Sequence, residues 1–149
     1  MLEITLDDAA FRQDLQRLYA RLGDFTPVMQ SLGAEFESRI SKRFETRRDP
    51  NGTAWTPWAA STRASYPKGG NRKILDRYST MLSSLSHQAN NSSVRIGFGQ
   101  PYSSYHEFST RTMPRRGLIY GDADAGTLAK SDEEAIVQML TDWINGSFD

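Results

Sequence analysis

His106 and Glu107 are the adjacent residues in this sequence that are best suited to catalysis. An imidazole and a carboxylate can act together in general acid–base chemistry. Ser103, Ser104 and Ser109 lie nearby, but no Gly-x-Ser-x-Gly motif of a hydrolase nucleophile surrounds them. A hydrolase that uses His106 and Glu107 is therefore one hypothesis. The simpler interpretation, which we favour, is a polar residue near a helix end that hydrogen-bonds to the backbone.

Two further short motifs partly match known ligand-binding patterns, but each lacks required residues. Asp122-x-Asp124 resembles the start of a calcium loop, but Gly126 comes one position too early for the required turn. We expect a solvated acidic turn there. Gly97-x-Gly99 lacks the third glycine and the helix of a phosphate-binding fingerprint, so both glycines are interpreted as strand residues. No metal and no cofactor is expected.

Composition narrows the class of protein. The chain has 149 residues, no cysteine and two histidines, which excludes disulfide scaffolds, thiolate zinc sites and cysteine nucleophiles. Its length and its 38% hydrophobic content predict a single domain over residues 1–149. No apolar run approaches the roughly 20 residues of a membrane span, and the N-terminus lacks the pattern of a signal peptide. We expect a protein made in the cytoplasm, without a membrane partner.

The charges cancel overall but are unevenly distributed. Lys plus Arg and Asp plus Glu each number 18. Residues 1–38 carry a balance of −4, residues 39–77 of +7, residues 78–121 of +3 and residues 122–149 of −6. If the fold keeps these regions apart, the basic surface of one copy could meet the acidic surface of the next, and such head-to-tail contacts close into rings or grow into filaments. The alternative is that the charges cancel within one molecule.

The basic region also raises the possibility of nucleic-acid binding. Basic residues gather between positions 39 and 48, and the aromatic residues Trp55, Trp58 and Tyr66 follow. Basic side chains bind phosphates and aromatic rings stack on bases. The competing interpretation is a solvated helix face followed by loop aromatics that pack onto the core. A net charge of zero weakens the long-range attraction on which nucleic-acid binding relies.

The first half of the chain predicts a short strand, two helices and a long loop. Residues 2–6 alternate like a strand. A helix capped by Asp7 or Asp8 ends at Gly23, and a second helix follows, with Thr26 as its cap and Pro27 in its first turn. The apolar stripes of these two helices are Phe11, Leu15, Leu18 and Leu22, and then Leu32, Phe36, Ile40 and Phe44. An irregular loop over residues 49–73 contains a short helix at 59–66, and is long enough to reach another subunit.

The second half predicts shorter elements. A short helix is expected over residues 75–85 and a strand over 93–99, for which 84–89 is the candidate hairpin partner. A helical turn at 101–108 and a strand at 118–120 follow. Ser131 and Glu134 form a predicted capping box for the last helix, which ends at Asn145-Gly146. The whole predicts an α+β domain in which helices pack on one face of a small, mainly antiparallel sheet.

The order of several short motifs resembles the phage virion morphogenesis family, which includes tail completion proteins of Mu-like and related contractile-tailed phages. Residues 49–58 resemble its Pro-x-Gly-x-x-Trp-x-Pro segment, and a basic stretch with Thr62, Arg63 and Lys68 follows. Residues 74–85 resemble its Ile-Leu element, 94–97 its Val-x-x-Gly strand, 102–109 its Tyr-Ala-x-x-His-x-Phe-Gly turn and 113–116 its Met-Pro-x-Arg segment. Ser103, Ser109 and Gly117 depart from the pattern.

The resemblance implies a structural virion protein rather than an enzyme. Such a protein would complete the head-proximal end of the tail and enable head–tail joining, plausibly as a sixfold ring. Its expected partners are further copies of itself, the tail tube or tail terminator, head and neck proteins, and DNA in the lumen. Its expected location is the tail–neck region of the virion. The alternative is a nucleic-acid-binding or head-completion (neck) protein that uses the basic region 39–73.

The resemblance also implies roles for particular residues. In the loop, Trp55 and Trp58 would anchor a neighbouring subunit or the tube end, because buried aromatic side chains dominate interface energetics. Arg115 and Arg116 would face the carboxylates of a partner or the lumen. His106 would brace the turn from Tyr102 to Phe108 rather than catalyse. The complete candidate assembly surface consists of Trp55, Trp58, Tyr66, Arg63, Lys68, Arg115 and Arg116.

Overall fold

The computed structural model describes residues 2–5, 13, 16, 23–66, 68, 73–76 and 78–146. The elements are β1 (Leu2–Thr5), α2 (Thr26–Thr46), α3 (Ala60–Ser65), α4 (Thr80–Ser83), β2 (Leu85–Ala89), β3 (Val94–Phe98), α5 (Ser103–Phe108) and α6 (Lys130–Ile144). This is the predicted α+β class. The helix predicted between Asp8 and Gly23 lies outside the described residues, apart from positions 13 and 16, which are helical.

The strands form one antiparallel sheet in the order β1-β3-β2. The predicted hairpin is confirmed: Leu85 lies opposite Phe98, and Ala89 lies opposite Val94. The turn between β2 and β3 is closed by the Asn90 side chain, whose Oδ1 accepts the backbone N–H groups of Ser92 and Ser93 at 2.9 and 2.8 Å. Short polar side chains that bind the backbone in this way favour tight turns.

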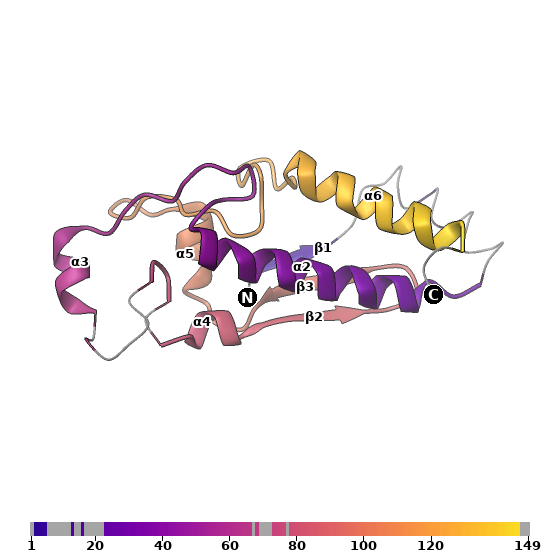
Figure 1. Ribbon diagram of the computed structural model, residues 1–149, viewed down its shortest axis with the longest axis horizontal. Helices are drawn as coiled ribbons and strands as arrows, with labels where there is room; N and C mark the ends of the chain where they lie inside the picture. Colours follow the sequence, from indigo (N-terminus) through magenta and orange to yellow (C-terminus); the bar gives the residue numbers. More distant parts are fainter. Residues whose placement is uncertain are drawn as a thin grey trace.

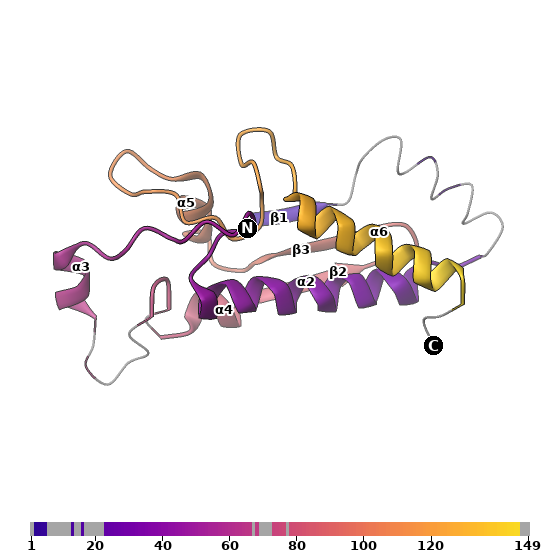
Figure 2. The same cartoon turned by 45° about the horizontal axis from the view of Figure 1, so that its top comes forward.

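Helix α2 lies along one face of the sheet (Figure 1). Its predicted stripe is confirmed, since Leu32, Phe36, Ile40 and Phe44 are all buried. The facing side chains of β3 are Val94, Ile96 and Phe98, which are buried too. Each fully buried apolar side chain of this size contributes about 1.5–3 kcal/mol of transfer free energy. Helix α6 runs alongside α2 in both views (Figure 2), and buries Ile136 and Leu140.

Gly33, in the middle of α2, makes room for a side chain from the sheet. A Cβ at this position would come within 2.2 Å of the His87 ring. His87 therefore lies directly against the helix, and its Nδ1 is 2.7 Å from Glu37 Oε1. A glycine inside a helix costs about 1 kcal/mol relative to alanine. The close approach of β2 to α2 accounts for its presence here.

Both long helices begin differently from the prediction. Asp24, not Thr26, supplies the capping side chain of α2: its Oδ1 accepts the Thr26 N–H at 2.9 Å and the Thr26 hydroxyl at 2.6 Å. Helix α6 begins after Ala129, so Ser131 and Glu134 lie within the helix and form no capping box. The buried ion pair of Asp132 with Arg43 fixes the first turn of α6 instead.

Two predicted elements are wrong. The helix expected over residues 75–85 is confined to Thr80–Ser83, because Leu75 and Ser79 have φ angles of 62° and 61°, which an α-helix excludes. The strand expected at residues 118–120 is absent. The backbone N–H groups of these three residues donate to the carboxylate of Glu107 and not to a neighbouring strand.

The molecule is elongated, and α3 lies at one end of its long axis (Figure 1). The start of α2 and the end of α6 lie at the opposite end. The loop that leads to α3 begins with a turn, in which Asp49 Oδ1 accepts the N–H groups of Asn51 and Thr53, and Gly52 has a φ of 86°. The short helix predicted at 59–66 is confirmed as α3. We call residues 55–66 the arm.

Candidate assembly surface

The first residue of the arm, Trp55, lies in the hydrophobic core. It is 4% exposed, and its ring meets Phe44 edge-on, with 5.7 Å between the ring centroids. Its Nε1 donates to the carbonyl oxygen of Gly117 at 3.0 Å. From the sequence, Trp55 is expected in the loop, as an anchor for a partner. The structure corrects that placement, since Trp55 anchors the arm to its own domain.

Glu107 and Arg115 form a buried connection between α5 and the segment that follows it. Glu107 is 0% exposed, and its two carboxylate oxygens accept the N–H groups of residues 118–120. Arg115 lies 3.2 Å from Glu107 Oε1, and also donates to the carbonyl oxygen of Tyr120 at 2.7 Å. These contacts give Glu107 a structural position, and they turn Arg115 toward its own chain rather than toward a partner.

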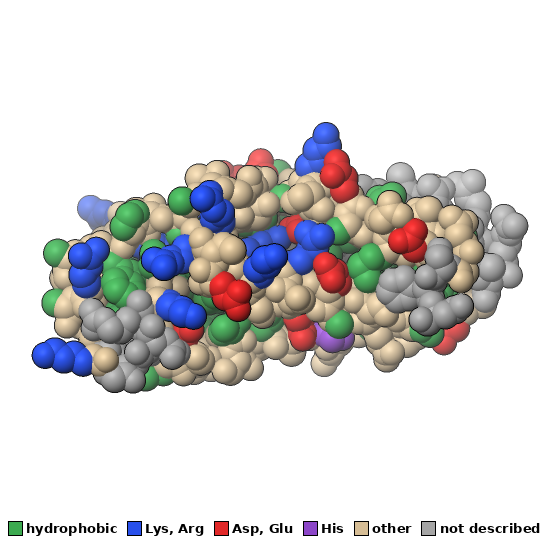
Figure 3. Space-filling model, in the orientation of Figure 1, with side chains coloured by type: hydrophobic (Ala, Val, Ile, Leu, Met, Phe, Trp, Pro, Cys, Tyr) green, Lys and Arg blue, Asp and Glu red, His purple; other side chains and the backbone are tan. Residues whose placement is uncertain are grey.

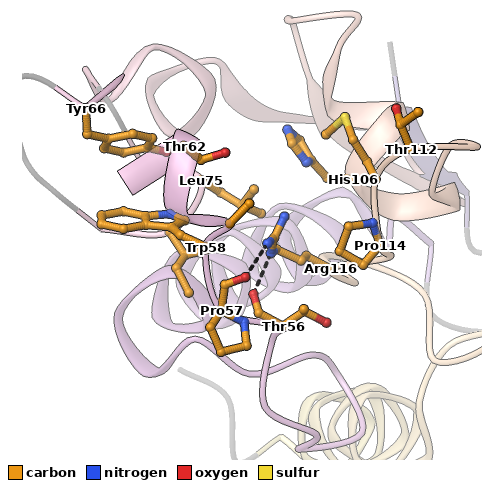
Figure 4. Close-up of a pocket in the computed structure, with 13 residues that line it drawn as sticks. Thr56, Pro57, Trp58, Thr62, Tyr66, Leu75, His106, Thr112, Pro114 and Arg116 are labelled. Carbon is orange, nitrogen blue, oxygen red and sulfur yellow. Dashed lines mark hydrogen bonds between the residues drawn. The ribbon is translucent and has the colours of Figure 1, made fainter. Parts of the chain in front are cut away.

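Arg116 holds the arm in place (Figure 4). Its Nε donates to the carbonyl oxygen of Thr56 at 2.8 Å, and one terminal nitrogen donates to that of Pro57 at 3.0 Å. Arg116 is 9% exposed, and desolvation by burial lowers the pKa of its guanidinium below the usual value. The expected orientation toward a lumen or partner is therefore not seen. The guanidinium instead forms the floor of a pocket.

This pocket, which we call the Arg116 pocket, has a volume of about 430 Å³. Trp58 and Tyr66 of the arm form one wall, with ring centroids 4.4 Å apart, and Figure 4 shows His106 above the guanidinium. Met113 contributes from the loop after α5. The indole Nε1 of Trp58 and the Nδ1 of His106 are buried and have no hydrogen-bond partner. The pocket thus combines apolar walls with unsatisfied polar atoms.

His106 was expected to brace the turn around α5 through hydrogen bonds. Its backbone does so, because the carbonyl oxygen accepts the N–H of Arg116 at 2.8 Å. The Nδ1 of the ring does not, since it has no hydrogen-bond partner. Burial, and then the charge of Arg116, lower the pKa of the imidazole below its usual value. Tyr102 and Phe108, which flank α5, are 38% and 46% exposed.

Basic residues surround this end of the molecule. Arg63 and Lys68 are exposed, and both line a second hollow of about 490 Å³ beside Trp58 and Tyr66. In the view of Figure 3, Lys and Arg gather over α3 and the middle of the molecule. The described atoms toward the far end include acidic but no basic side chains in that view. On this face, the basic side chains are therefore confined to the α3 end and the middle, where acidic side chains lie among them.

The basic stretch of α2 is less available than the sequence indicated. Arg43 is buried and pairs with Asp132, whose other oxygen lies 3.3 Å from Arg39. Lys42 and Arg47 remain exposed. A nucleic-acid surface on this helix would thus lose two of the charges on which the hypothesis rested.

Neither a metal site nor a membrane segment is found in the part of the chain that the structure describes. No three His, Asp or Glu side chains of that part group together as metal ligands would. Asp122 uses its Oδ1 to accept the N–H of Ala125, as expected for a solvated turn. None of the described helices combines the length and the apolarity that a membrane crossing requires.

Comparison with known proteins decides the family. The sequence pattern of the phage virion morphogenesis family matches residues 6–144. The chain belongs to this family. It is also 24% identical over 144 residues to "Mu-like prophage FluMu G protein 2" of Haemophilus influenzae, with 96% of each chain covered. No solved structure gives a significant match. The chain is accordingly a phage structural or assembly protein.

Family membership gives the resembling motifs a structural meaning. In the Pro-x-Gly-x-x-Trp-x-Pro segment, Gly52 makes the turn, Trp55 fills the core and Pro57 accepts a hydrogen bond from Arg116. In the Met-Pro-x-Arg segment, Arg116 supplies that bond. The two segments are about sixty residues apart and pack together to build the arm. The separation of the motifs along the chain concealed this contact from sequence reasoning.

Proposed function

We propose that this chain completes the head-proximal end of a phage tail and enables head–tail joining as a homo-oligomeric ring. The observation that carries the proposal is the family match over residues 6–144. The relative's name, a Mu-like prophage protein, agrees with a contractile-tailed phage. The role is structural rather than enzymatic, and it belongs to the tail–neck region of the virion.

Two features of the molecule support a self-associating role. Basic side chains lie at the end that carries α3, and acidic ones lie on the described surface toward the other end (Figure 3). The described surface also exposes large aromatic side chains, among them Tyr105 at 56% and Tyr78 at 66%. Opposite charges on opposite ends favour head-to-tail contacts, and exposed aromatic residues are typical anchors of interfaces.

The joining role is tested with a phage that lacks the gene for this chain. We expect lysates that contain filled heads and separate tails, and purified chain added to the lysate should restore joined virions, counted by electron microscopy. Virions that join normally without the chain would contradict the proposal. So would the absence of assembled tails, because the chain would then act earlier than tail completion.

The alternative function, a nucleic-acid-binding or head-completion protein, depends on the basic region 39–73. It predicts that the purified chain binds DNA, and that this binding weakens steeply as salt rises. Fluorescence anisotropy with labelled DNA at low salt measures it. Tight binding that is lost in a variant with Lys42→Glu and Arg47→Glu would favour the alternative over tail completion.

A further inference from the structure

Among the described residues, the Arg116 pocket contains no carboxylate counter-ion for its guanidinium, unlike the surroundings of Arg43 and Arg115. Arg43 pairs with the buried carboxylate of Asp132, and Arg115 pairs with that of Glu107. Arg116 donates to two backbone carbonyl oxygens of the arm, and no Asp or Glu lines the pocket among the described residues. Burying a cation without a counter-ion is costly, so a carboxylate that entered the pocket would be strongly favoured.

Two more polar atoms of the pocket have no hydrogen-bond partner, and the indole N–H is a donor that a carboxylate would satisfy. The indole Nε1 of Trp58 is a donor without a partner, and the Nδ1 of His106 is unpartnered as well. Both side chains line the pocket beside the Arg116 guanidinium (Figure 4). A carboxylate oxygen accepts from a guanidinium and from an indole N–H. The remaining walls are apolar, with Leu75 and Met113, so an acidic side chain next to an apolar one fits best.

The chain itself carries such a pair on α6. Glu133 and Glu134 are exposed in its first turns, and Glu134 forms an exposed ion pair with Lys130 at 3.9 Å. Val137 follows one turn later and is 56% exposed. Residues three and four apart share one face of a helix, so these side chains form one acidic and apolar knob. The other large hydrophobic side chains exposed in the described part are Tyr78, Tyr102, Tyr105 and Phe108, which lie on or near α5.

We propose that the Arg116 pocket of one copy receives the knob of Glu133, Glu134 and Val137 from a second copy. The inference rests on the proposed function, because it names the contact between neighbouring subunits of the ring. The pocket and the knob are different surfaces of the same chain, so the contact is heterologous, and its repetition generates a closed ring or a filament. Charge complementarity favours this occupant, since the carboxylate of Glu133 would meet a guanidinium that has no carboxylate partner among the described residues.

Cysteine cross-linking tests the contact directly, because the chain contains no cysteine of its own. Thr112 lines the pocket and is exposed. We expect a mixture of Thr112→Cys and Val137→Cys chains, one of them tagged, to form a disulfide-linked heterodimer on oxidation. The control replaces Val137→Cys with Asp124→Cys, which puts the thiol on an exposed acidic turn outside the knob.

Two variants test the chemistry of the pocket without removing Arg116. Trp58→Phe deletes the unpartnered N–H and keeps the ring beside Tyr66, and Glu133→Lys reverses one charge of the knob. Each is expected to raise the dissociation constant of the oligomer by about tenfold. Asp124→Lys, the same charge change on another exposed turn, should leave that constant unchanged.

The outcomes separate the pocket from the proposed function. If the chain forms a ring, but the heterodimer is no more abundant than in the control, a different surface makes the ring and the pocket proposal is wrong. A cross-link from Thr112→Cys to a tail protein would also overturn it, because the occupant would be another partner. If joining fails to depend on the chain at all, the proposed function itself is contradicted.

Discussion

Glu107 is a fully buried carboxylate that joins two segments of the chain. It accepts three backbone N–H groups from residues 118–120 and pairs with Arg115. One side chain therefore accepts the backbone N–H groups that would otherwise need the carbonyl oxygens of a neighbouring strand. The adjacent His106 and Glu107 suggest acid–base chemistry from the sequence alone. The structural role of Glu107 depends instead on residues 118–120, which lie more than ten positions further along the chain.

Replacing Glu107 tests this structural use. Glu107→Gln keeps the shape, removes the charge and brings an amide donor against backbone donors. We expect a loss of about 2–3 kcal/mol in the free energy of unfolding, measured by chemical denaturation. The control is Glu133→Gln at an exposed position, for which a change below about 0.5 kcal/mol is expected. Equal stabilities of the two variants would contradict the buried network.

The two tryptophans of the arm offer a matched comparison. Trp55→Phe loses the hydrogen bond to Gly117 and leaves that carbonyl oxygen unpaired, so we expect a loss of about 1–2 kcal/mol in unfolding free energy. Trp58→Phe loses a donor that has no partner in the single chain, so its stability should stay close to that of the wild type. Thermal or chemical denaturation of both variants measures the difference, and a reversed order would contradict the assigned environments.

Sequence reasoning could find the aromatic residues of the arm but not their environments. The composition of residues 49–73 indicated a functional loop with aromatic anchors. Trp55 lies in the core, where it packs against Phe44 and hydrogen-bonds to Gly117. Both partners lie outside the loop, so the composition of the loop does not reveal them. The prediction that Arg116 faces a partner or the lumen also failed because its contacts are not local. Its carbonyl partners sixty residues away leave no local signal.

At the scale of elements, helix α2 and the β2–β3 hairpin were predictable because their patterns are local. The apolar stripe of α2 repeats at helical spacing, and the turn at Asn90 separates two short strands. The strand expected at 118–120 failed because burial of an apolar run does not by itself specify a strand. The helix expected over 75–85 failed because the positive φ angles of Leu75 and Ser79 have no clear sequence signal.

The carboxyl group of Asp24 at the start of α2 is expected to make the stability of the fold depend on pH. Hydrogen bonds from the Thr26 hydroxyl, and then from its backbone N–H, lower the pKa of Asp24 below 3.8. A depressed carboxyl pKa stabilises the fold above the unfolded value, and that contribution disappears as the pH falls through the folded value. Wild type should therefore exceed Asp24→Asn in stability at pH 7, and the difference should shrink below about pH 4. Denaturation curves at several pH values check this, and a constant difference would contradict it.

At the scale of the whole molecule, the uneven charge of the sequence persists in space. The end with α3 is basic, and the described surface toward the start of α2 is acidic (Figure 3). The sequence left open whether these charges cancel within one molecule. The buried pair of Asp132 with Arg43 shows that some do cancel, while Arg63, Lys68 and Glu133 remain exposed.

If opposite ends of neighbouring copies meet, their association depends on salt. Charges on exposed surfaces are screened over about 10 Å at 0.1 M salt and about 3 Å at 1 M. We therefore expect the association constant of the chain to fall as salt rises from 0.05 to 0.5 M, measured by analytical ultracentrifugation. An association that strengthens with salt would indicate a predominantly apolar interface and would contradict a charge-driven contact.

The central claim is that this chain forms a ring at the end of a tail. Light scattering across a wide range of protein concentrations, with and without purified tail tubes, tests it most directly. We expect a discrete ring in solution, or a monomer that becomes a ring on the tubes. A chain that remains monomeric at every concentration and ignores the tubes would contradict it, and would favour a head-side or DNA-bound role.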